Sequence, residues 1–162
     1  MADISHKKAR ILVVDDDREF AKVLLEYLNR MGYEAEAAYG GGEGIERFKH
    51  GGFQMVVTNM EMPDIDGMEI LDAVKSINKN TVVLMITGYP TIDGAVEAIK
   101  AGAYDCISKP VDFKAMEVII RQALERHTFS KRFGEHRGLT RALIISIPFW
   151  LILGIVFGLV WK

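Results

Sequence analysis

The sequence predicts an α/β fold, a doubly wound parallel sheet of five strands, followed by one C-terminal transmembrane helix. Three observations lead to this prediction. Short apolar runs rich in β-branched residues alternate with segments in which apolar residues recur at helical spacing. Polar residues directly follow four of these runs, as they do at the carboxyl edge of a parallel sheet. Finally, an uncharged apolar stretch occupies residues 142–161.

The first strand and the first helix have the clearest signals. Residues 10–14 (RILVV) form a β-branched run that stops at three aspartates, as a buried parallel strand does at a polar edge. Asp17 is expected to cap the helix that follows, and Gly32 is expected to end it. Between them, apolar residues lie three and four positions apart: Phe20, Val23, Leu24, Tyr27, Leu28 and Met31.

The same alternation continues along the chain. The remaining strands are expected over residues 33–38, 53–58, 82–86 and 103–107, and the remaining helices over 43–50, 68–77, 92–101 and 113–127. Short buried strands that alternate with helices form a parallel sheet covered on both faces, because each right-handed crossover places its helix on one face. We therefore expect one globular domain over residues 8–127.

Polar residues gather at the expected carboxyl edge of this sheet. Asp15 and Asp16 follow the first strand, Asn59 the third, Thr87 the fourth and Lys109 the fifth. Because doubly wound sheets carry their functional groups at the carboxyl ends of their strands, we expect these side chains around one small cavity. Two adjacent carboxylates repel each other when alone and favour a hard cation such as Mg²⁺ between them.

Four motifs resemble the receiver domain of bacterial response regulators, the CheY-like modules of two-component phosphorelay signalling. They are ILVVDDD, VVTNMEMPDIDG, VVLMITGYP and AIKAGAYDCISKP, in that order, within residues 10–126. The resemblance implies a flavodoxin-like sheet of strand order 2-1-3-4-5. The last two motifs look most like receivers of regulators that activate alternative-sigma-factor transcription. Since no ATPase or DNA-binding domain follows them here, a stand-alone receiver is expected.

The resemblance also implies roles for individual residues. Asp15 and Asp16 would hold Mg²⁺ together with the residue at position 59 and the main-chain carbonyl of Glu61. Thr87 would donate a hydrogen bond to a phosphoryl oxygen, and Lys109 would neutralise the phosphoryl charge. The proline after this lysine, Pro110, resembles the cis-proline turn of the family, which helps to aim the lysine.

Asn59 stands where the family carries the aspartate that accepts the phosphoryl group. A carboxamide oxygen is a far poorer nucleophile than a carboxylate, so covalent phosphorylation is expected to fail. The neutral amide also removes one negative charge, so we expect weaker Mg²⁺ binding and one formal partner fewer for Lys109. Cys106 is a second departure, because the family usually carries a Tyr or Phe three residues before the lysine. Its apolar neighbours predict a small buried core residue.

The C-terminal segment predicts a membrane anchor. Residues 142–161 (ALIISIPFWLILGIVFGLVW) have no charged side chain and no polar stripe, and about 20 helical residues span the hydrocarbon core of a bilayer. Residues 128–141 form a basic juxtamembrane linker, which places the receiver domain in the cytoplasm by the positive-inside rule. Gly154 and Gly158 have the GxxxG spacing that allows two helices to pair as a homodimer, although glycine is also common in membrane-spanning helices.

These features predict a non-enzymatic signalling module, a membrane-tethered receiver that binds a sensor histidine kinase or another signalling protein. The formal net charge of -2 argues against direct nucleic-acid binding. Three alternatives stay open. In the first, Asn59 is an engineered substitution in a phosphorylatable regulator. In the second, a neighbouring acid such as Asp64 or Asp66 accepts the phosphoryl group. The third belongs to another class of protein: the chain is a small Mg²⁺-dependent phosphatase, and the acidic run at residues 15–17 is part of its site.

Overall fold

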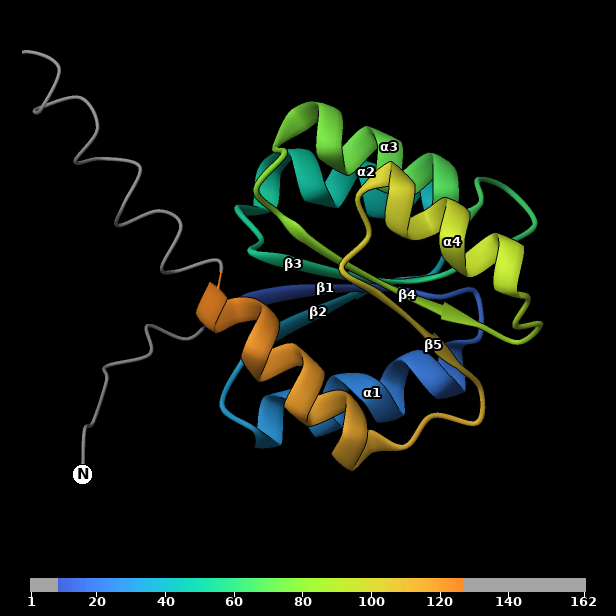
Figure 1. Ribbon diagram of the computed structural model, residues 1–162. Coiled ribbons are helices and arrows are strands. Elements are labelled where there is room, and N and C mark those ends of the chain that lie inside the picture. The colour runs from blue at the N-terminus through green and yellow to red at the C-terminus, as the bar shows by residue number, and fades with distance from the viewer. Residues whose placement is uncertain (1–8, 127–162) are drawn as a thin grey trace, which may run out of the picture. The chain divides into compact units, whose positions relative to one another are not determined.

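The computed structural model describes residues 9–126, in which strands alternate with helices along the chain (Figure 1). In chain order the elements are β1 (Arg10–Val14), α1 (Arg18–Arg30), β2 (Glu34–Ala38), α2 (Gly41–Gly51), β3 (Met55–Asn59), α3 (Gly67–Ile77), β4 (Val82–Thr87), α4 (Ile92–Ala101) and β5 (Asp105–Ser108). A further helix occupies residues 113–126.

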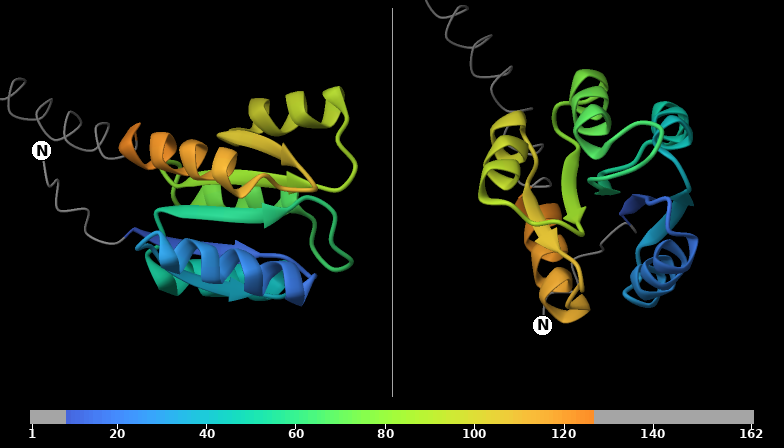
Figure 2. Two further views of the ribbon diagram at one scale, coloured as in Figure 1. Left: turned by 90° about the horizontal axis from the view of Figure 1, so that it is seen from below. Right: turned by 90° about the vertical axis from the view of Figure 1, so that its right-hand side faces the viewer.

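The five strands form one parallel sheet of order β2-β1-β3-β4-β5, which confirms the predicted doubly wound, flavodoxin-like topology. Every pair of neighbouring strands is parallel, and the strand arrows that are visible in the left view of Figure 2 point the same way. The carboxyl ends of β1, β3, β4 and β5 therefore meet at one edge of the sheet, where the sequence places its polar residues.

The ends of the elements agree with the sequence signals to within about two residues, which is the usual scatter of helix and strand boundaries. Asp17 caps α1 by accepting hydrogen bonds from the backbone N–H groups of Glu19 and Phe20. Two expectations need correction. Asn59 and Thr87 are the last residues of β3 and β4 rather than the first residues after them, because each still pairs with a neighbouring strand, Asn59 with Ile86 and Thr87 with Ser108.

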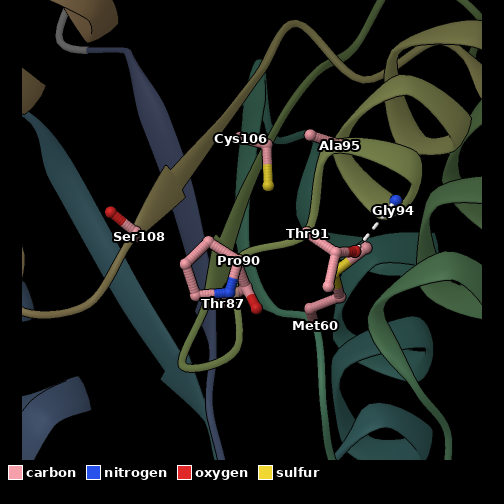
Figure 3. A pocket seen from close by; sticks show the side chains of 8 residues that line it. All are labelled: Met60, Thr87, Pro90, Thr91, Gly94, Ala95, Cys106 and Ser108. Atoms are coloured by element: carbon pink, nitrogen blue, oxygen red, sulfur yellow. Dashed lines mark hydrogen bonds between the residues drawn. The ribbon is translucent and has the colours of Figure 1, made fainter.

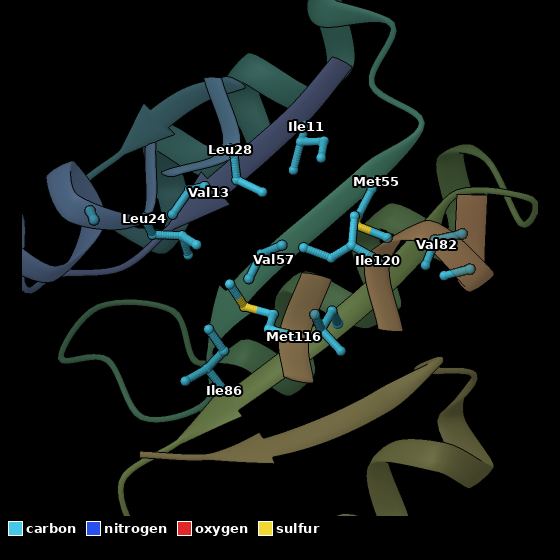
Figure 4. Packing of buried hydrophobic residues seen from close by; sticks show 13 residues of the cluster. Ile11, Val13, Leu24, Leu28, Met55, Val57, Val82, Ile86, Met116 and Ile120 are labelled. Carbon is cyan, nitrogen blue, oxygen red and sulfur yellow. The ribbon is translucent and has the colours of Figure 1, made fainter. Parts of the chain in front are cut away.

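Each face of the sheet is covered by its own hydrophobic core. The first core joins β1, β3 and β4 to α1 and the helix at residues 113–126, through buried side chains such as Leu24, Leu28, Met116 and Ile120 (Figure 4). The second core packs α2, α3 and α4 on the opposite face. In that second core α4 is the least embedded helix, because Ala98 is its only buried residue. The two cores fix the strands, and with them the positions of the polar side chains at their ends.

Several expectations concern residues outside the described range. These residues include the linker at 128–141, the apolar segment at 142–161 and the pair Gly154 and Gly158. Within residues 9–126, none of the helices combines the length and the apolarity needed to cross a membrane.

Candidate functional site

The predicted site residues come together at the carboxyl edge of the sheet. Asp15 directly follows β1 and is 1% exposed, while Asn59 and Thr87 end β3 and β4 at 8% and 3% exposure. Lys109 directly follows β5, and its ammonium group reaches back across the sheet to Asp15. Asp16 lies at the exposed rim of the group. The ends of four strands, with the residues that directly follow them, thus assemble one polar cluster, as the sequence predicted.

Lys109 and Asp15 form the ion pair at the base of this cluster. The Lys109 Nζ lies 3.0 Å from Asp15 Oδ2 and 4.4 Å from the centre of the Phe20 ring. The peptide bond between Lys109 and Pro110 is cis, as the resemblance implied. Lys109 therefore keeps one carboxylate partner although position 59 is neutral. The contact with Phe20 could not be found from the sequence, because nothing in the linear pattern places this ring under the ammonium.

Burial dominates the electrostatics of Asp15. Loss of solvent raises the pKa of its carboxyl group above the ordinary value, although a hydrogen bond from the Asp17 N–H and the nearby Lys109 ammonium both favour ionisation. The Asp17 N–H lies 2.9 Å from Asp15 Oδ1. Because Lys109 only partly compensates for the desolvation, the site holds a carboxylate that is costly to keep charged.

The side chain of Asn59 is fixed by two hydrogen bonds from its amide nitrogen. Nδ2 donates to Asp16 Oδ1 over 3.0 Å and to the main-chain oxygen of Glu61 over 2.6 Å. The opposite orientation of the amide would place Oδ1 against two oxygen acceptors that have no proton to share. The carboxamide therefore presents its N–H₂ group to Asp16 and to the Glu61 carbonyl.

This orientation bears directly on a metal ion at the site. Carboxylate, amide and main-chain oxygens are the ligands that Mg²⁺ prefers, so Asp15, Asp16, Asn59 and the Glu61 carbonyl form a suitable set in kind. As arranged, however, an N–H donor lies between Asp16 and the Glu61 carbonyl, and a donor nitrogen cannot ligate a cation. No cluster of three or more His, Cys, Asp or Glu side chains suited to a metal occurs within residues 9–126. The arrangement does not fit Mg²⁺ until the Asn59 amide turns over.

The side chain of Glu61 has a role that sequence analysis missed, since only its main chain was expected to take part. The Thr87 hydroxyl donates to Glu61 Oε1 over 2.8 Å, and the N–H of Gly88 points to Oε2 over 3.4 Å. Thr87 in turn accepts a hydrogen bond of 3.0 Å from the N–H of Tyr89. No pattern in the sequence signals this contact, because Glu61 lies in the loop after β3 whereas Thr87 ends β4.

A cavity of about 140 Å³ adjoins Thr87, between α4 and β5 (Figure 3). Its lining residues are Met60, Thr87, Pro90, Thr91, Gly94, Ala95, Cys106 and Ser108. The prediction that Cys106 is a buried core residue is wrong, because its side chain is only partly buried and lines this cavity. The physical reason is that β5 is the edge strand of the sheet, so that only one neighbouring strand covers it.

Asp64 ties the loop after β3 to the start of α2. Its carboxylate accepts hydrogen bonds of 3.1 Å from the N–H groups of Gly41 and Gly42, which are among the unpaired donors of that helix. Hydrogen bonds from the N–H groups of Ile65, Gly41 and Gly42 lower the pKa of Asp64 to about 2. Sequence analysis could not assign this role, since a helix cap supplied by a distant loop leaves no local signature.

The Asp64→Ala variant is expected to lower the free energy of unfolding at neutral pH by about 1 kcal/mol, because Asp64 is exposed and solvent screens its charge. A carboxyl group with a lowered pKa in the folded state stabilises above its ordinary pKa, here 3.8, and that contribution disappears as the pH falls towards about 2. Urea titrations of both proteins at several pH values measure the difference. Asp64→Asn, which keeps one acceptor oxygen, should lose less. An equal loss at all pH values would contradict the expectation.

The fold and the site define a class: a doubly wound domain with an acid pair, a hydroxyl and a lysine at the carboxyl ends of its strands is a receiver-type signalling domain. The profile of the response regulator receiver domain matches residues 11–121, and the chain belongs to this family. Receiver domains interact with histidine kinases in two-component systems and bind Mg²⁺ at the phosphorylation site.

Regulators and solved structures with similar sequences agree. The transcriptional regulatory protein ZraR of Escherichia coli (strain K12) is 35% identical over 127 residues, which are 78% of this chain and 29% of ZraR. The regulatory protein AtoC of the same strain is 31% identical over 137 residues, 85% of this chain and 29% of AtoC. The chain therefore spans less than a third of the length of these relatives.

Two solved structures show the same likeness. A response regulator receiver domain protein from Clostridium thermocellum has 32% sequence identity and a TM-score of 0.71, and the match covers 75% of this chain and 98% of that one. The beryllofluoride-activated NtrC4 receiver domain dimer has 35% identity and a TM-score of 0.70, with 73% of this chain and 98% of that one covered. The second structure also illustrates that receiver domains can dimerise.

Proposed function

We propose that this chain is a membrane-tethered receiver that takes no phosphoryl group and acts by binding other signalling proteins rather than by catalysis. The observation that carries the proposal is the state of Asn59. Its carboxamide occupies the acceptor position of an otherwise complete pocket and donates both of its hydrogen bonds to Asp16 and Glu61. An amide held in this way offers no nucleophilic carboxylate to a phosphoryl donor.

The surface around α4 and β5, extending to residue 126, supports protein binding. Large apolar side chains on and before α4 are exposed: Tyr89 at 80%, Ile92 at 84%, Val96 at 44% and Ile99 at 47%. Exposed apolar side chains that lie together mark interaction sites on soluble domains. A sensor histidine kinase or another receiver is the proposed partner. Pull-down with the full chain should retain such a protein, and an Ile92→Asp variant should lose it. Equal retention by both would count against this surface.

The apolar residues 142–161 support the membrane tether, and the basic residues before them support a receiver domain on the cytoplasmic side. Pairing of these segments through Gly154 and Gly158 remains part of the proposal. After cell fractionation, the full chain should sediment with membranes, whereas a chain that ends at residue 130 should stay in the supernatant. Recovery of the full chain in the supernatant would contradict the tether.

Mg²⁺ is expected to stabilise an Asn59→Asp variant more than the native chain. Binding to the native chain must first break both hydrogen bonds of the Asn59 amide, whereas an aspartate presents two oxygens and one more negative charge. At about 10 mM Mg²⁺ the variant should gain about 1–2 kcal/mol, and the native chain less than about 0.5 kcal/mol. Thermal unfolding with and without Mg²⁺ measures both gains. NaCl at matched ionic strength controls for general ionic effects, and an equal gain in both proteins would refute the expectation.

A further inference from the structure

Glu61 is bound at both its main chain and its side chain by other members of the cluster. Its carbonyl oxygen accepts the 2.6 Å hydrogen bond from Asn59, and its carboxylate accepts from the Thr87 hydroxyl and faces the Gly88 N–H. The first contact reaches it from the end of β3, and the second and third from the end of β4. Glu61 thus bridges two strand ends.

The two groups that face the Glu61 carboxylate are both hydrogen-bond donors. A serine-type hydroxyl and a backbone N–H, set on adjacent residues, together bind two oxygens of a single anion. The Glu61 carboxylate uses them in this way, with Oε1 2.8 Å from Thr87 Oγ1 and Oε2 3.4 Å from the Gly88 nitrogen. An oxyanion from solution that needs these two donors would have to displace Glu61 first.

We infer that the Glu61 carboxylate is a built-in anion, which occupies the oxyanion position at the end of β4 and excludes phosphate-type anions from it. The inference deepens the proposed function, on which it rests, because it concerns the same pocket. It assigns to the Glu61 side chain a role separate from that of the main-chain carbonyl. Asn59 prevents the covalent reaction, and Glu61 prevents the non-covalent entry of its anionic group.

Charge and connectivity both support this role. An anion that enters while Glu61 remains in place would lie next to the Glu61 carboxylate, and like charges in contact repel. The hydrogen bonds also form a series: Asn59 donates to the Glu61 carbonyl, the Thr87 hydroxyl donates to the Glu61 carboxylate, and the Tyr89 N–H donates to the Thr87 hydroxyl. Tyr89 lies directly before the exposed residues of α4, so Glu61 holds the loop that leads into the proposed binding surface in one arrangement.

The test is a titration of the full chain in detergent micelles with inorganic phosphate, followed through the amide NMR signals of Gly88 and Tyr89. Glu61→Ala should bind phosphate about tenfold more tightly than the native chain, and Glu61→Gln should lie between them, because glutamine keeps an acceptor oxygen but not the charge. Glu26→Gln removes an exposed charge in the middle of α1, from a residue outside the site, and should bind phosphate as weakly as the native chain.

Two results would overturn the inference. If the native chain and Glu61→Ala bind phosphate equally, Glu61 does not exclude anions from the position. If Glu61→Ala shows no saturable binding while its thermal unfolding remains cooperative, the Thr87 hydroxyl and the Gly88 N–H do not form an oxyanion site. The proposed function has a separate readout, the intact mass of the native chain after exposure to a phosphoryl donor. A phosphoryl adduct would refute the proposed function, and the role of Glu61 would still be decided by the phosphate titration. If the titration shows no difference between the native chain and Glu61→Ala, the argument that Asn59 prevents phosphorylation still holds.

Discussion

Replacing Asn59 with aspartate is expected to restore a phosphoryl acceptor, so that the variant takes a single phosphoryl group and the chain with Asn59 takes none. The variant carboxylate would attack the phosphorus atom of acetyl phosphate, acetate would leave, and an acyl phosphate would form on the side chain. Lys109, Thr87 and the acid pair already lie at this edge of the sheet in the native chain, and the Glu61 carboxylate has to leave the Thr87 hydroxyl before a phosphoryl oxygen can accept from it. We therefore expect an effect close to all or none.

The measurement is intact mass after incubation of the full chain with acetyl phosphate and Mg²⁺. Asn59→Asp should gain one phosphoryl group, whereas the native chain and Asn59→Ala should gain none. A phosphoryl group on native protein would contradict the assignment, and fragmentation would show whether Asp64 or Asp66 carries it. Asp64 is a poor candidate in this structure, because its oxygens are engaged by the N–H groups of Gly41 and Gly42.

Gly67→Ala is expected to be among the most destabilising single-methyl changes near the site. A Cβ atom at this position would lie 2.5 Å from the main-chain oxygen of Asn59 and 2.8 Å from the Cα of Met60. Both contacts are with backbone, which cannot move aside as a flexible side chain can. The first turn of α3 would therefore have to shift away from the end of β3, and Asn59 with it. Overpacking of this kind costs about 1–3 kcal/mol.

Gly88→Ala is the matched control, because an added Cβ there meets no atom within 4 Å and its N–H remains available. It should change the free energy of unfolding by less than about 0.5 kcal/mol. Urea unfolding followed by circular dichroism compares the two variants with the native chain. The interpretation fails if Gly67→Ala is as stable as Gly88→Ala, since the helix start would then have room that the structure does not show.

Much of the fold could be predicted because its signals are local. The β-branched run at residues 10–14 and the capping aspartate Asp17 each act within a few residues, and both predictions are confirmed. The site could also be predicted, since parallel strands of known order bring their carboxyl ends to one edge. The motifs at Asp15, Asn59, Thr87 and Lys109 then identify the residues that meet there.

The missed features depend on contacts between a loop and a distant helix or strand. Glu61 meets Thr87, Asp64 meets Gly41, and Phe20 lies under the ammonium of Lys109, and each pair joins segments far apart in sequence. Such contacts follow from the exact course of loops, which no hydrophobic period or capping pattern specifies. The exposure of Cys106 was misjudged for a related reason, because its apolar neighbours do not reveal that β5 lies at the edge of the sheet.

The shallow seating of α4 has a consequence for how a partner can use it. One buried alanine, Ala98, anchors this helix, whereas α1 and α2 each bury three residues and α3 buries four. Segments with few buried contacts open at the lowest free energy, well below that needed to unfold the whole domain. For the proposed partner, α4 is therefore the element that can shift at the lowest cost in free energy while the sheet stays intact.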